Sequence, residues 1–428
     1  MWPSRPRLGE KKKRSQPRAA VPQIIKDDAM LTYRTAGESH GKAMLAVIEG
    51  FPAGVRADLK FVDRELARRQ GGYGRGGRMK VETARVEVLS GLRRGVTLGS
   101  PIVLQIANRD FRLDDLKRTP SLYQPRPGHG DLAGAIKYLT PDVRNILERA
   151  SARETAARVA AGSFVRSLLR EAGIGVFAHV VSVGPVRVNP SPLGEGGPSG
   201  PGEGLRPETI SPSWLRLRDK SPLYCLDRNA EGEMIAAIDA ARDAGDTLGG
   251  IFDIIATAVP PGLGSHVAAD RRLDGRLAAA LMSIPAIKGV EIGLGFEAAR
   301  LPGSQVHDAI LYHPAERRSS TLGYARTSNG AGGLEAGISN GQPIVLRAAM
   351  KPIATLAQPL ASIDLRTKRA VKAAYERSDF CAVPAASVVG ENAVAFELAA
   401  ALLEKTGGDS LAEVKGNLAA FLKLAREI

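Results

Sequence analysis

The spacing of apolar residues along the chain predicts strands and helices that follow one another in a mixed order. Residues 43–49 have the pattern of a half-buried strand. Apolar side chains recur at helical spacing over 58–70, and Gly71 with Gly72 ends that helix. Further strands are predicted at 80–89, 101–107, 251–258 and 343–350. The pattern as a whole predicts a mixed α/β (α+β) fold.

Other helices are predicted where a capping residue precedes an apolar stripe. A helix over 148–173 contains Ser151 and Glu154 at the spacing of a capping box. A last helix begins at Ser410, where Glu413 has the same spacing. The remaining helices are expected at 234–242, at 272–284 and from 384 to about 405.

Two stretches have the composition of loops. Residues 1–29 combine prolines with a basic run at 11–14 and lack apolar periodicity, so we expect a disordered basic extension. Structured pattern begins at Leu31, which favours Met30 as the true start; a genuine basic tail or a targeting peptide is the alternative. Residues 189–206 are rich in Pro and Gly and predict a surface loop within one domain over 30–428.

The composition is that of an ordinary soluble globular protein. Of 428 residues, 44% are apolar and 24% are charged. No apolar run suggests a membrane span, and the basic N-terminus lacks the apolar core of a secretory signal. Two cysteines, Cys225 and Cys381, argue against a disulfide framework and against a cysteine-based metal site. We therefore expect a cytoplasmic protein without a metal.

The net charge of +14 indicates an anionic partner. Residues 1–29 carry eight Lys/Arg and three Asp/Glu, a net charge of +5, which leaves +9 for the remainder. Aromatic residues make up only 5%, and the arginines lie beside glycines. Nucleic-acid binders usually interleave basic and aromatic side chains, so this pattern favours a phosphorylated small molecule.

Two histidines lie in glycine-flanked loops that could transfer protons. His40 lies in GESHG at 37–41, and His129 lies in RPGHGD at 126–131. The unperturbed pKa of imidazole is near neutrality, and glycines let a ligand approach the backbone closely. The alternative is a polar turn whose histidine bonds to nearby backbone. The other histidines lack such a setting and are expected to be structural or exposed: His179, His266, His307 and His313.

Arginines and glycines also gather in stretches that suit a phosphate. The stretch 68–78 interleaves the two, which predicts a hinged cationic lid; a solvated, RNA-binding RGG-like tract is the alternative. Arg149 and Arg153 flank an expected helix N-terminus, where free N–H groups and the helix dipole favour an anion. A glycine-dense stretch at 327–341 permits close approach to a flat ligand. The sequence contains no P-loop, metal-ligand cluster or nucleophile elbow.

Taken together and in order, these motifs resemble those of chorismate synthase. The main matching blocks are GESHG at 37–41, RASARET at 149–155 and RSD at 377–379 with its Cys-Ala-Val-Pro continuation. RPGH at 126–129, SIPAIKGVE at 283–291 and AMKP at 349–352 also match. The resemblance covers essentially all of 30–428. Family members usually begin a few residues before the first block, which supports Met30 as the start.

The resemblance implies the last step of the shikimate pathway to the aromatic amino acids. A chorismate synthase removes phosphate from 5-enolpyruvylshikimate 3-phosphate by a 1,4-anti elimination, which needs reduced FMN without net redox change. The family fold is a β-α-β sandwich with internal pseudo-symmetry, assembled as a homotetramer. We expect a monofunctional cytoplasmic enzyme, since no dinucleotide site is recognisable. Its reduced FMN would come from a separate flavin reductase and ultimately from NAD(P)H.

The resemblance also implies roles for individual residues. His40 would protonate the leaving phosphate, and His129 would lie near the flavin and protonate reduced FMN; the spacing itself does not decide which histidine serves which. Asp379 would take the proton from flavin N5, with Ser39 and Ser151 as relays. Anions of the substrate or of NADPH would be held by Arg69, Arg75, Arg126, Arg153 and Arg377. FMN contacts would come from Arg149, Ala150, Ser151, Pro285, Ala286, Ala336, Lys351, Pro352, Ile353, Ala354, Thr355 and Arg377.

Three positions depart from the family pattern. Gly330 stands where the family often has arginine, Ala336 where it usually has glycine, and Phe380 where a smaller residue is usual. These changes concern affinity, because none removes a proton-transfer group. A basic RNA- or nucleotide-binding protein is the alternative function. A flavin oxidoreductase with net hydride transfer would need the dinucleotide site that the sequence lacks.

Overall fold

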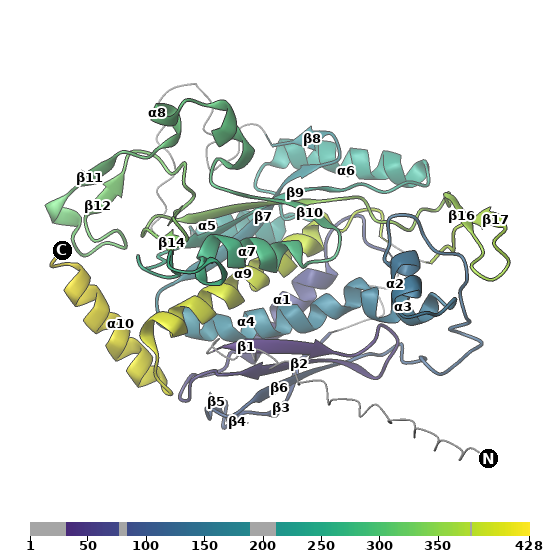
Figure 1. The fold of residues 1–428 in the computed structure, drawn as a ribbon, viewed down its shortest axis with the longest axis horizontal. Coiled ribbons are helices and arrows are strands. Elements are labelled where there is room, and N and C mark those ends of the chain that lie inside the picture. Colours follow the sequence, from purple (N-terminus) through teal and green to yellow (C-terminus); the bar gives the residue numbers. More distant parts are fainter. Residues whose placement is uncertain (1–30, 77–83, 189–210, 377–378) are drawn as a thin grey trace, which may run out of the picture.

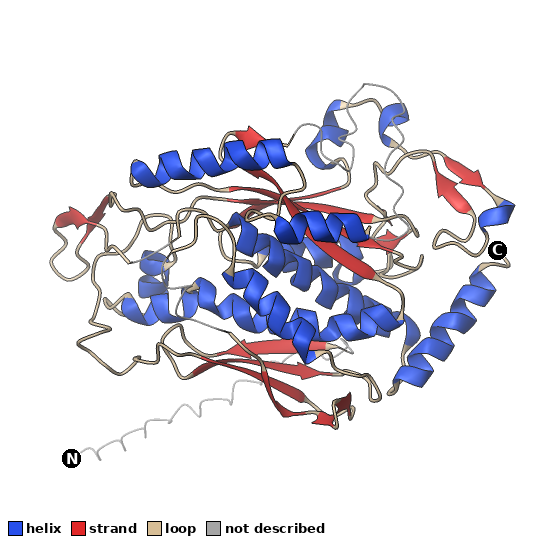
Figure 2. Cartoon of the chain, turned by 180° about the vertical axis from the view of Figure 1, so that it is seen from behind, coloured by secondary structure: helices blue, strands red, loops and turns tan. Residues whose placement is uncertain are grey.

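A computed structural model describes residues 31–76, 84–188, 211–376 and 379–428. Within these ranges two antiparallel sheets enclose a layer of helices, which gives a β-α-β sandwich (Figures 1 and 2). The first sheet has the order β1 (Thr32–Ala36), β2 (Ala43–Glu49), β6 (Ile102–Ala107), β3 (Glu87–Ser90). The second has the order β10 (Ile287–Ile292), β15 (Ile344–Met350), β9 (Gly250–Thr257), β7 (Gly175–Val183), β8 (Val186–Arg187). The predicted α+β fold is confirmed.

The helical layer and the peripheral elements complete the fold. The long helices of the layer are α1 (Leu59–Gln70), α4 (Thr155–Glu171), α7 (Leu273–Met282) and α9 (Val383–Thr406). The other helices are α2 (Asp131–Lys137), α3 (Arg144–Ala150), α5 (Pro212–Lys220), α6 (Arg228–Asp243), α8 (Gly303–Val306) and α10 (Leu411–Ala425). Short hairpins are formed by β4 (Leu92–Arg93) with β5 (Val96–Thr97), β11 (Ile310–Tyr312) with β12 (Tyr324–Arg326), β13 (Leu334–Glu335) with β14 (Ile338–Ser339), and β16 (Ala361–Ile363) with β17 (Ala370–Lys372).

The chain passes twice through the same sequence of elements. The first half runs β1-β2-α1-β3-β6-α4 and the second runs β7-β9-α7-β10-β15-α9. The sheet orders correspond as well, because β1-β2-β6-β3 matches β7-β9-β15-β10, and every neighbouring pair is antiparallel. The internal pseudo-symmetry expected from the family is therefore present in the topology.

α4 and α9 are buried on almost every side because a sheet covers each outer face of the helical layer. At their contact a Cβ on Gly162 would lie 2.1 Å from the carbonyl oxygen of Asn392, so the close approach requires glycine. By length and composition α9 could cross a membrane, although 94% of its apolar window is buried inside the protein. That burial is typical of the core helix of a soluble protein.

Most of the predicted elements match the structure closely. The strand at 43–49 is β2, the helix at 58–70 is α1 with Asp58 as its N-cap, and α10 begins with the predicted capping box of Ser410 and Glu413. Residues 1–29, the loop at 189–206 and the first part of the strand at 80–89 lie outside the described residues.

The helix predicted over 148–173 is wrong at its start. α3 ends at Ala150, a single 3₁₀ turn follows over Ala152–Glu154, and α4 begins only at Thr155. Ser151 accepts a hydrogen bond from the Arg153 amide, while Glu154 binds Thr35 and Arg158 instead of closing a capping box. Contacts with β1 and α4 thus take the glutamate away from the local motif.

Candidate active site

His40 lies in the tight connection between β1 and β2. Gly37 has a φ of +107°, and a Cβ there would lie 2.2 Å from the Ala43 carbonyl oxygen, so this turn requires glycine. The side-chain amide of Asn108, which follows β6, donates to the Gly41 carbonyl oxygen at 2.8 Å. The loop that presents the histidine is therefore fixed at both ends.

Glu148, at the end of α3, binds His40 and its loop. The carboxylate oxygens lie 2.9 and 3.1 Å from Nδ1 of His40, and the His40 amide donates to the same carboxylate at 2.9 Å. The Ser39 amide donates to the Glu148 carbonyl oxygen at 2.8 Å. Burial by itself would raise the pKa of Glu148, but the hydrogen bonds from His40 hold it below its ordinary value. A carboxylate thus orients the histidine ring.

Arg69, Arg75 and Arg153 form an arginine cluster beside the N-terminus of α4. In the last turn of α1, Arg69 donates from Nε to Thr155 Oγ1 at 2.7 Å and from Nη2 to the Ala152 carbonyl oxygen at 2.5 Å. Its Nη1 is buried without an acceptor in the described part of the chain. Burial, with repulsion from Arg75 and Arg153, lowers the pKa of Arg69 to about 9. A bound anion would accept a hydrogen bond from Nη1 and would reduce the repulsion among the three arginines.

Asp379 joins the arginine cluster from the segment that precedes α9. It accepts from Arg75 Nη1 at 2.7 Å and from the Gly76 amide at 2.7 Å. Arg68, the other described arginine of the Gly-Arg stretch beside Arg69 and Arg75, binds Glu65 at 2.8 Å and is 9% exposed. Such buried ion pairs are not those of the solvated, RNA-binding RGG-like tract that was the alternative for this stretch. Arg377 lies outside the described residues.

His129 also has a carboxylate and an arginine as partners. Its Nδ1 lies 2.5 Å from Asp131 Oδ1, and Arg126 donates from Nε to Asp131 Oδ2 at 2.8 Å. Arg126 continues to Thr355 Oγ1 at 3.0 Å, which links the loop before α2 to the segment after β15. Burial would raise the pKa of Asp131, but hydrogen bonds from His129 and Arg126 hold it well below its usual range.

The segments after α7 and after β15 meet beside the His129 loop. The Lys351 amide donates to the Ala286 carbonyl oxygen at 2.9 Å. A Cβ on Gly128 would lie 3.7 Å from Lys351 Nζ, so the loop and the lysine are in contact. Partial burial and the charge of Lys288 lower the pKa of Lys351. A partly buried lysine that feels a second positive charge suits a phosphate.

Comparison with known proteins identifies the family of this chain. The family model of chorismate synthase matches residues 31–403. The chain belongs to the chorismate synthase family. It is 54% identical over 406 residues to the chorismate synthase of Desulforudis audaxviator, covering 93% of this chain and 98% of that protein. It is 52% identical over 407 residues to the enzyme of Moorella thermoacetica, with 93% and 100% covered. A solved structure described as the crystal structure of chorismate synthase matches with a TM-score of 0.73 and 42% identity, covering 93% and 99%.

Membership of the chorismate synthase family makes the protein a carbon–oxygen lyase of aromatic amino-acid biosynthesis. The structure brings Arg69, Arg75, Arg153 and Asp379 together where α4 and the segment before α9 meet the end of α1. Arg158, one turn into α4, donates to Ser283 Oγ at 2.7 Å and so connects the arginine cluster side to the segment holding Pro285 and Ala286.

Two flavin-contact candidates of the chorismate synthase pattern are engaged within the protein. Arg149 donates to the carbonyl oxygens of Gly37 and Thr35 at 2.8 and 2.9 Å, which braces the His40 loop. Ser151 caps the 3₁₀ turn before α4. Ala150 is the last residue of α3 between them.

Among the described candidates, Ala336 lies apart from Pro285 and Ala286. It lies in the β13–β14 hairpin, and the next residue, Gly337, accepts from the amide of Leu273 at the start of α7 at 2.9 Å. Pro285 and Ala286 follow the other end of α7. The ten-residue helix separates the two groups by roughly 15 Å at 1.5 Å per residue.

The departures from the chorismate synthase pattern have local explanations at two positions. A Cβ on Gly330 would lie 2.5 Å from the Val306 carbonyl oxygen, so this backbone leaves no room for an arginine side chain. Ala336 has a φ of +50°, which is where glycine is favoured. Phe380 packs against the hydrophobic core, and nothing further in the structure explains its size.

Four further polar residues hold the site together although the sequence analysis gave them no role. They are Asn108, Arg112, Asp131 and Glu148. Asn108 accepts from Arg153 Nε at 2.8 Å while its amide holds the His40 loop, so it joins the arginine cluster to the histidine. Of these four, only Asp131 could have been suspected from the sequence, because it stands two residues after His129.

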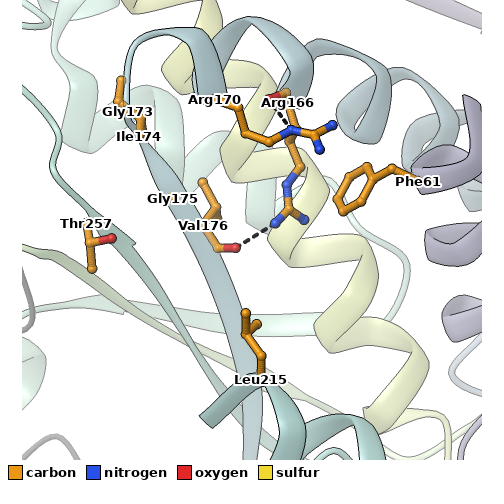
Figure 3. A pocket seen from close by; sticks show the side chains of 9 residues that line it. All are labelled: Phe61, Arg166, Arg170, Gly173, Ile174, Gly175, Val176, Leu215 and Thr257. Carbon is orange, nitrogen blue, oxygen red and sulfur yellow. Dashed lines mark hydrogen bonds between the residues drawn. The ribbon is translucent and has the colours of Figure 1, made fainter. Parts of the chain in front are cut away.

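A cavity of about 300 Å³ near the far end of α4 is separate from this site. Figure 3 shows Arg166, Arg170 and Phe61 at its wall, with the Arg166 guanidinium directed at the Val176 carbonyl oxygen, 2.7 Å away. Arg166 also binds Glu391 at 2.7 Å. Its charge is neutralised there, and the described residues that line the cavity include no proton-transfer group.

Proposed function

We propose that the protein converts 5-enolpyruvylshikimate 3-phosphate to chorismate and phosphate, the last step of the shikimate pathway. The observation that carries the proposal is the arginine cluster beside a carboxylate-held histidine, joined through Asn108. The substrate has two carboxylates and a phosphate, and buried anions need fixed cations. Arg69, Arg75 and Arg153 would bind these anions, together with Arg126 and Arg377. NADPH binding at Arg69 and Arg75 is the alternative use of the same cations.

In this proposal two histidines and an aspartate divide the proton transfers. His40 donates a proton to the phosphate oxygen as the carbon–oxygen bond breaks, and Glu148 keeps the imidazole oriented. His129, held by Asp131, provides the proton donor on the flavin side. Asp379, paired with Arg75, would accept the proton that the flavin gives up, with Ser39 and Ser151 as relays.

The residues around Lys351 fit FMN as the cofactor. Lys351 would bind its phosphate, and the charge of Lys288, which acts on Lys351, would add to the attraction. Positive φ at Ala286 (+70°) shapes the backbone against which Lys351 packs, together with Pro285 and the segment through Thr355. When bound in its reduced form, FMN would supply transient electron donation to the substrate and a site that accepts its hydrogen, without net redox change. The chain's own residues bind it, orient the substrate and move the protons.

The remaining parts of the proposal concern supply and assembly. The enzyme would be monofunctional and cytoplasmic, and reduced FMN would come from a separate flavin reductase that uses NAD(P)H. It would assemble as a homotetramer. We propose no nucleic-acid or membrane partner.

An anaerobic assay tests the proposal. Purified protein, reduced FMN and substrate should yield chorismate, whereas His40→Ala and His129→Ala should each reduce turnover about a hundredfold or more. His313→Ala is the control, because this histidine lies outside the site. If the parent protein forms no chorismate under reducing conditions, the proposed function is wrong. Chorismate formed from oxidised FMN and NADPH by the pure protein would refute the monofunctional assignment.

A further inference from the structure

Both ring nitrogens of His40 are occupied in the structure. Nδ1 faces the Glu148 carboxylate at 2.9 Å, and Nε2 faces Nη2 of Arg112 at 3.1 Å. The amides of Arg112 and Leu113 also donate to the His40 carbonyl oxygen, each at 3.0 Å. The segment after β6 is thus bound to the histidine at three points.

These partners fix the tautomer of His40. A carboxylate only accepts hydrogen bonds, so Nδ1 carries the hydrogen that Glu148 accepts. A guanidinium only donates, so Nε2 offers its lone pair to Arg112. In this arrangement His40 has no proton on Nε2 to give to a substrate. A proton donor at this position therefore needs Arg112 to move away first.

Arg112 is partly exposed and has a donor to offer to an anion. Its remaining ion pair is with Asp110 at 3.3 Å, and 27% of its side chain is exposed. Its Nε is buried with no acceptor among the residues that the structure describes. A phosphate dianion would satisfy this donor and offer the bidentate geometry that guanidinium groups favour.

We propose that Arg112 is a ligand of the substrate phosphate and covers Nε2 of His40 until the phosphate arrives. The proposal rests on the function proposed above. When Arg112 turns to the phosphate, the lone pair of Nε2 takes a proton from solvent. As the carbon–oxygen bond breaks, its electron pair goes to the phosphate oxygen, which takes that proton from Nε2. Nδ1–H stays with Glu148, so His40 ends neutral.

The charged groups around His40 are compatible with this sequence. Glu148 from α3 and Arg112 from the segment after β6 touch the ring, Asp110 pairs with Arg112, and Arg144 acts on Glu148 through its charge. Arg118 provides a matched control, because it pairs with the same Asp110 at 2.9 Å but its side chain is 52% exposed.

Inorganic phosphate is the probe for the test. The full chain, labelled with ¹⁵N-histidine, would be titrated with phosphate as parent, Arg112→Gln, Arg112→Lys and Arg118→Gln. His40→Gln assigns the His40 signals. In the parent, phosphate should shift Nε2 of His40 from an unprotonated to a protonated signal. In Arg112→Gln the phosphate affinity measured through this signal should fall about tenfold or more, with Arg112→Lys between it and the parent and Arg118→Gln close to the parent.

Two outcomes would overturn the proposal: phosphate leaves the Nε2 signal of the parent unchanged, or Arg112→Gln and Arg118→Gln lose affinity equally. A second measurement with substrate should show a raised KM for Arg112→Gln. These results are separable from the function itself. The phosphate titration needs no turnover, and failure of the parent to form chorismate would refute the reaction without changing the titration.

Discussion

The first half of the sandwich connects β1 to β2 through residues 37–42, whereas the second half connects β7 to β9 through 184–249. The short connection presents His40, and the long one contains α5 and α6 but no candidate site residue. The connection from the last strand to the last helix of each half carries site residues in both cases. It spans 108–154 in the first half and 351–382 in the second.

This difference shows how one repeated scaffold makes a single asymmetric site. The equivalent helices α4 and α9 start beside the same Gly-Arg loop, because Arg69 binds Thr155 and Arg75 binds Asp379. The first half contributes both histidines and the substrate arginines of the described chain. The second contributes Asp379 and the segment that begins at Lys351. The repeated strands and helices hold the connecting loops in place, and different loops provide the binding and the proton-transfer residues.

The largest expected effect comes from removing one proton-transfer group from each half. His40→Asn and Asp379→Asn should each lower kcat by about 10²- to 10⁴-fold, because both act on the same elimination. Groups that act as a unit are strongly non-additive, so the double variant should lose much less than the product of the single losses. Single-turnover assays under anaerobic conditions measure this. Full additivity would indicate independent roles and contradict the shared site.

The next largest effect is a loss of stability when the buried ion pairs between the two halves are broken. Glu391 of α9 binds Arg68 of α1, Arg166 of α4 and Arg218 of α5 at 3.2, 2.7 and 3.2 Å. Glu391→Gln removes the one carboxylate that these three buried guanidinium groups share, so the free energy of unfolding should fall by about 3 kcal/mol in urea titrations at pH 7. Glu397→Gln is the control on the same helix. Burial raises the pKa of Glu397, so its neutral replacement should leave stability unchanged or slightly higher.

The same glutamate predicts a dependence of stability on pH. Burial opposes ionisation of Glu391, but Arg68, Arg218 and Arg166 overcome it and lower its pKa to about 2. In the unfolded chain Glu391 has the ordinary, higher pKa of a glutamate and therefore binds its proton at higher pH than in the folded protein. The stabilisation is therefore fully present above about pH 5 and is lost as pH falls toward the folded value. Urea titrations between pH 3 and 6 should give a shallower decline for Glu391→Gln than for the parent, and parallel declines would contradict this origin.

A smaller effect is expected where the second half binds FMN. Lys351→Ala should raise the Kd of FMN about tenfold, because one charge-assisted contact to phosphate is lost. Quenching of flavin fluorescence measures this affinity. Lys423→Ala, in α10 and away from the site, should leave the Kd unchanged. If Lys351→Ala binds FMN as tightly as the parent does, cations other than Lys351 bind the phosphate.

The smallest effect concerns the backbone at Ala336. Its φ of +50° disfavours any side chain, so Ala336→Gly should raise the free energy of unfolding by about 0.5–1 kcal/mol. Ala279→Gly in the middle of α7 is the matched control, and it should lower stability by about 1 kcal/mol because glycine is unfavourable in a helix. Thermal unfolding followed by circular dichroism compares the two. A loss of stability in both variants would show that Ala336 is not strained.

Local patterns in the sequence were enough to predict individual elements. Apolar periodicity located β2 and α1 to within a residue, and the capping box at Ser410 marked the start of α10. The same reasoning failed at Ser151, because Thr35 and Arg158 bind Glu154 in the folded protein. A local motif predicts well only where no distant partner competes for its side chains.

The sequence by itself determined that this protein has glycine-flanked histidines, arginine-rich glycine loops and helices and strands in a mixed order. These features depend on residues close together in the chain, where hydrogen bonds and periodicity act. Only the tertiary structure decided which groups meet. His40 is paired with Glu148 across 108 positions, and Arg126 with Thr355 across 229. Such pairs form because two sheets close over one helical layer and exclude water, so that each buried charge must find a partner.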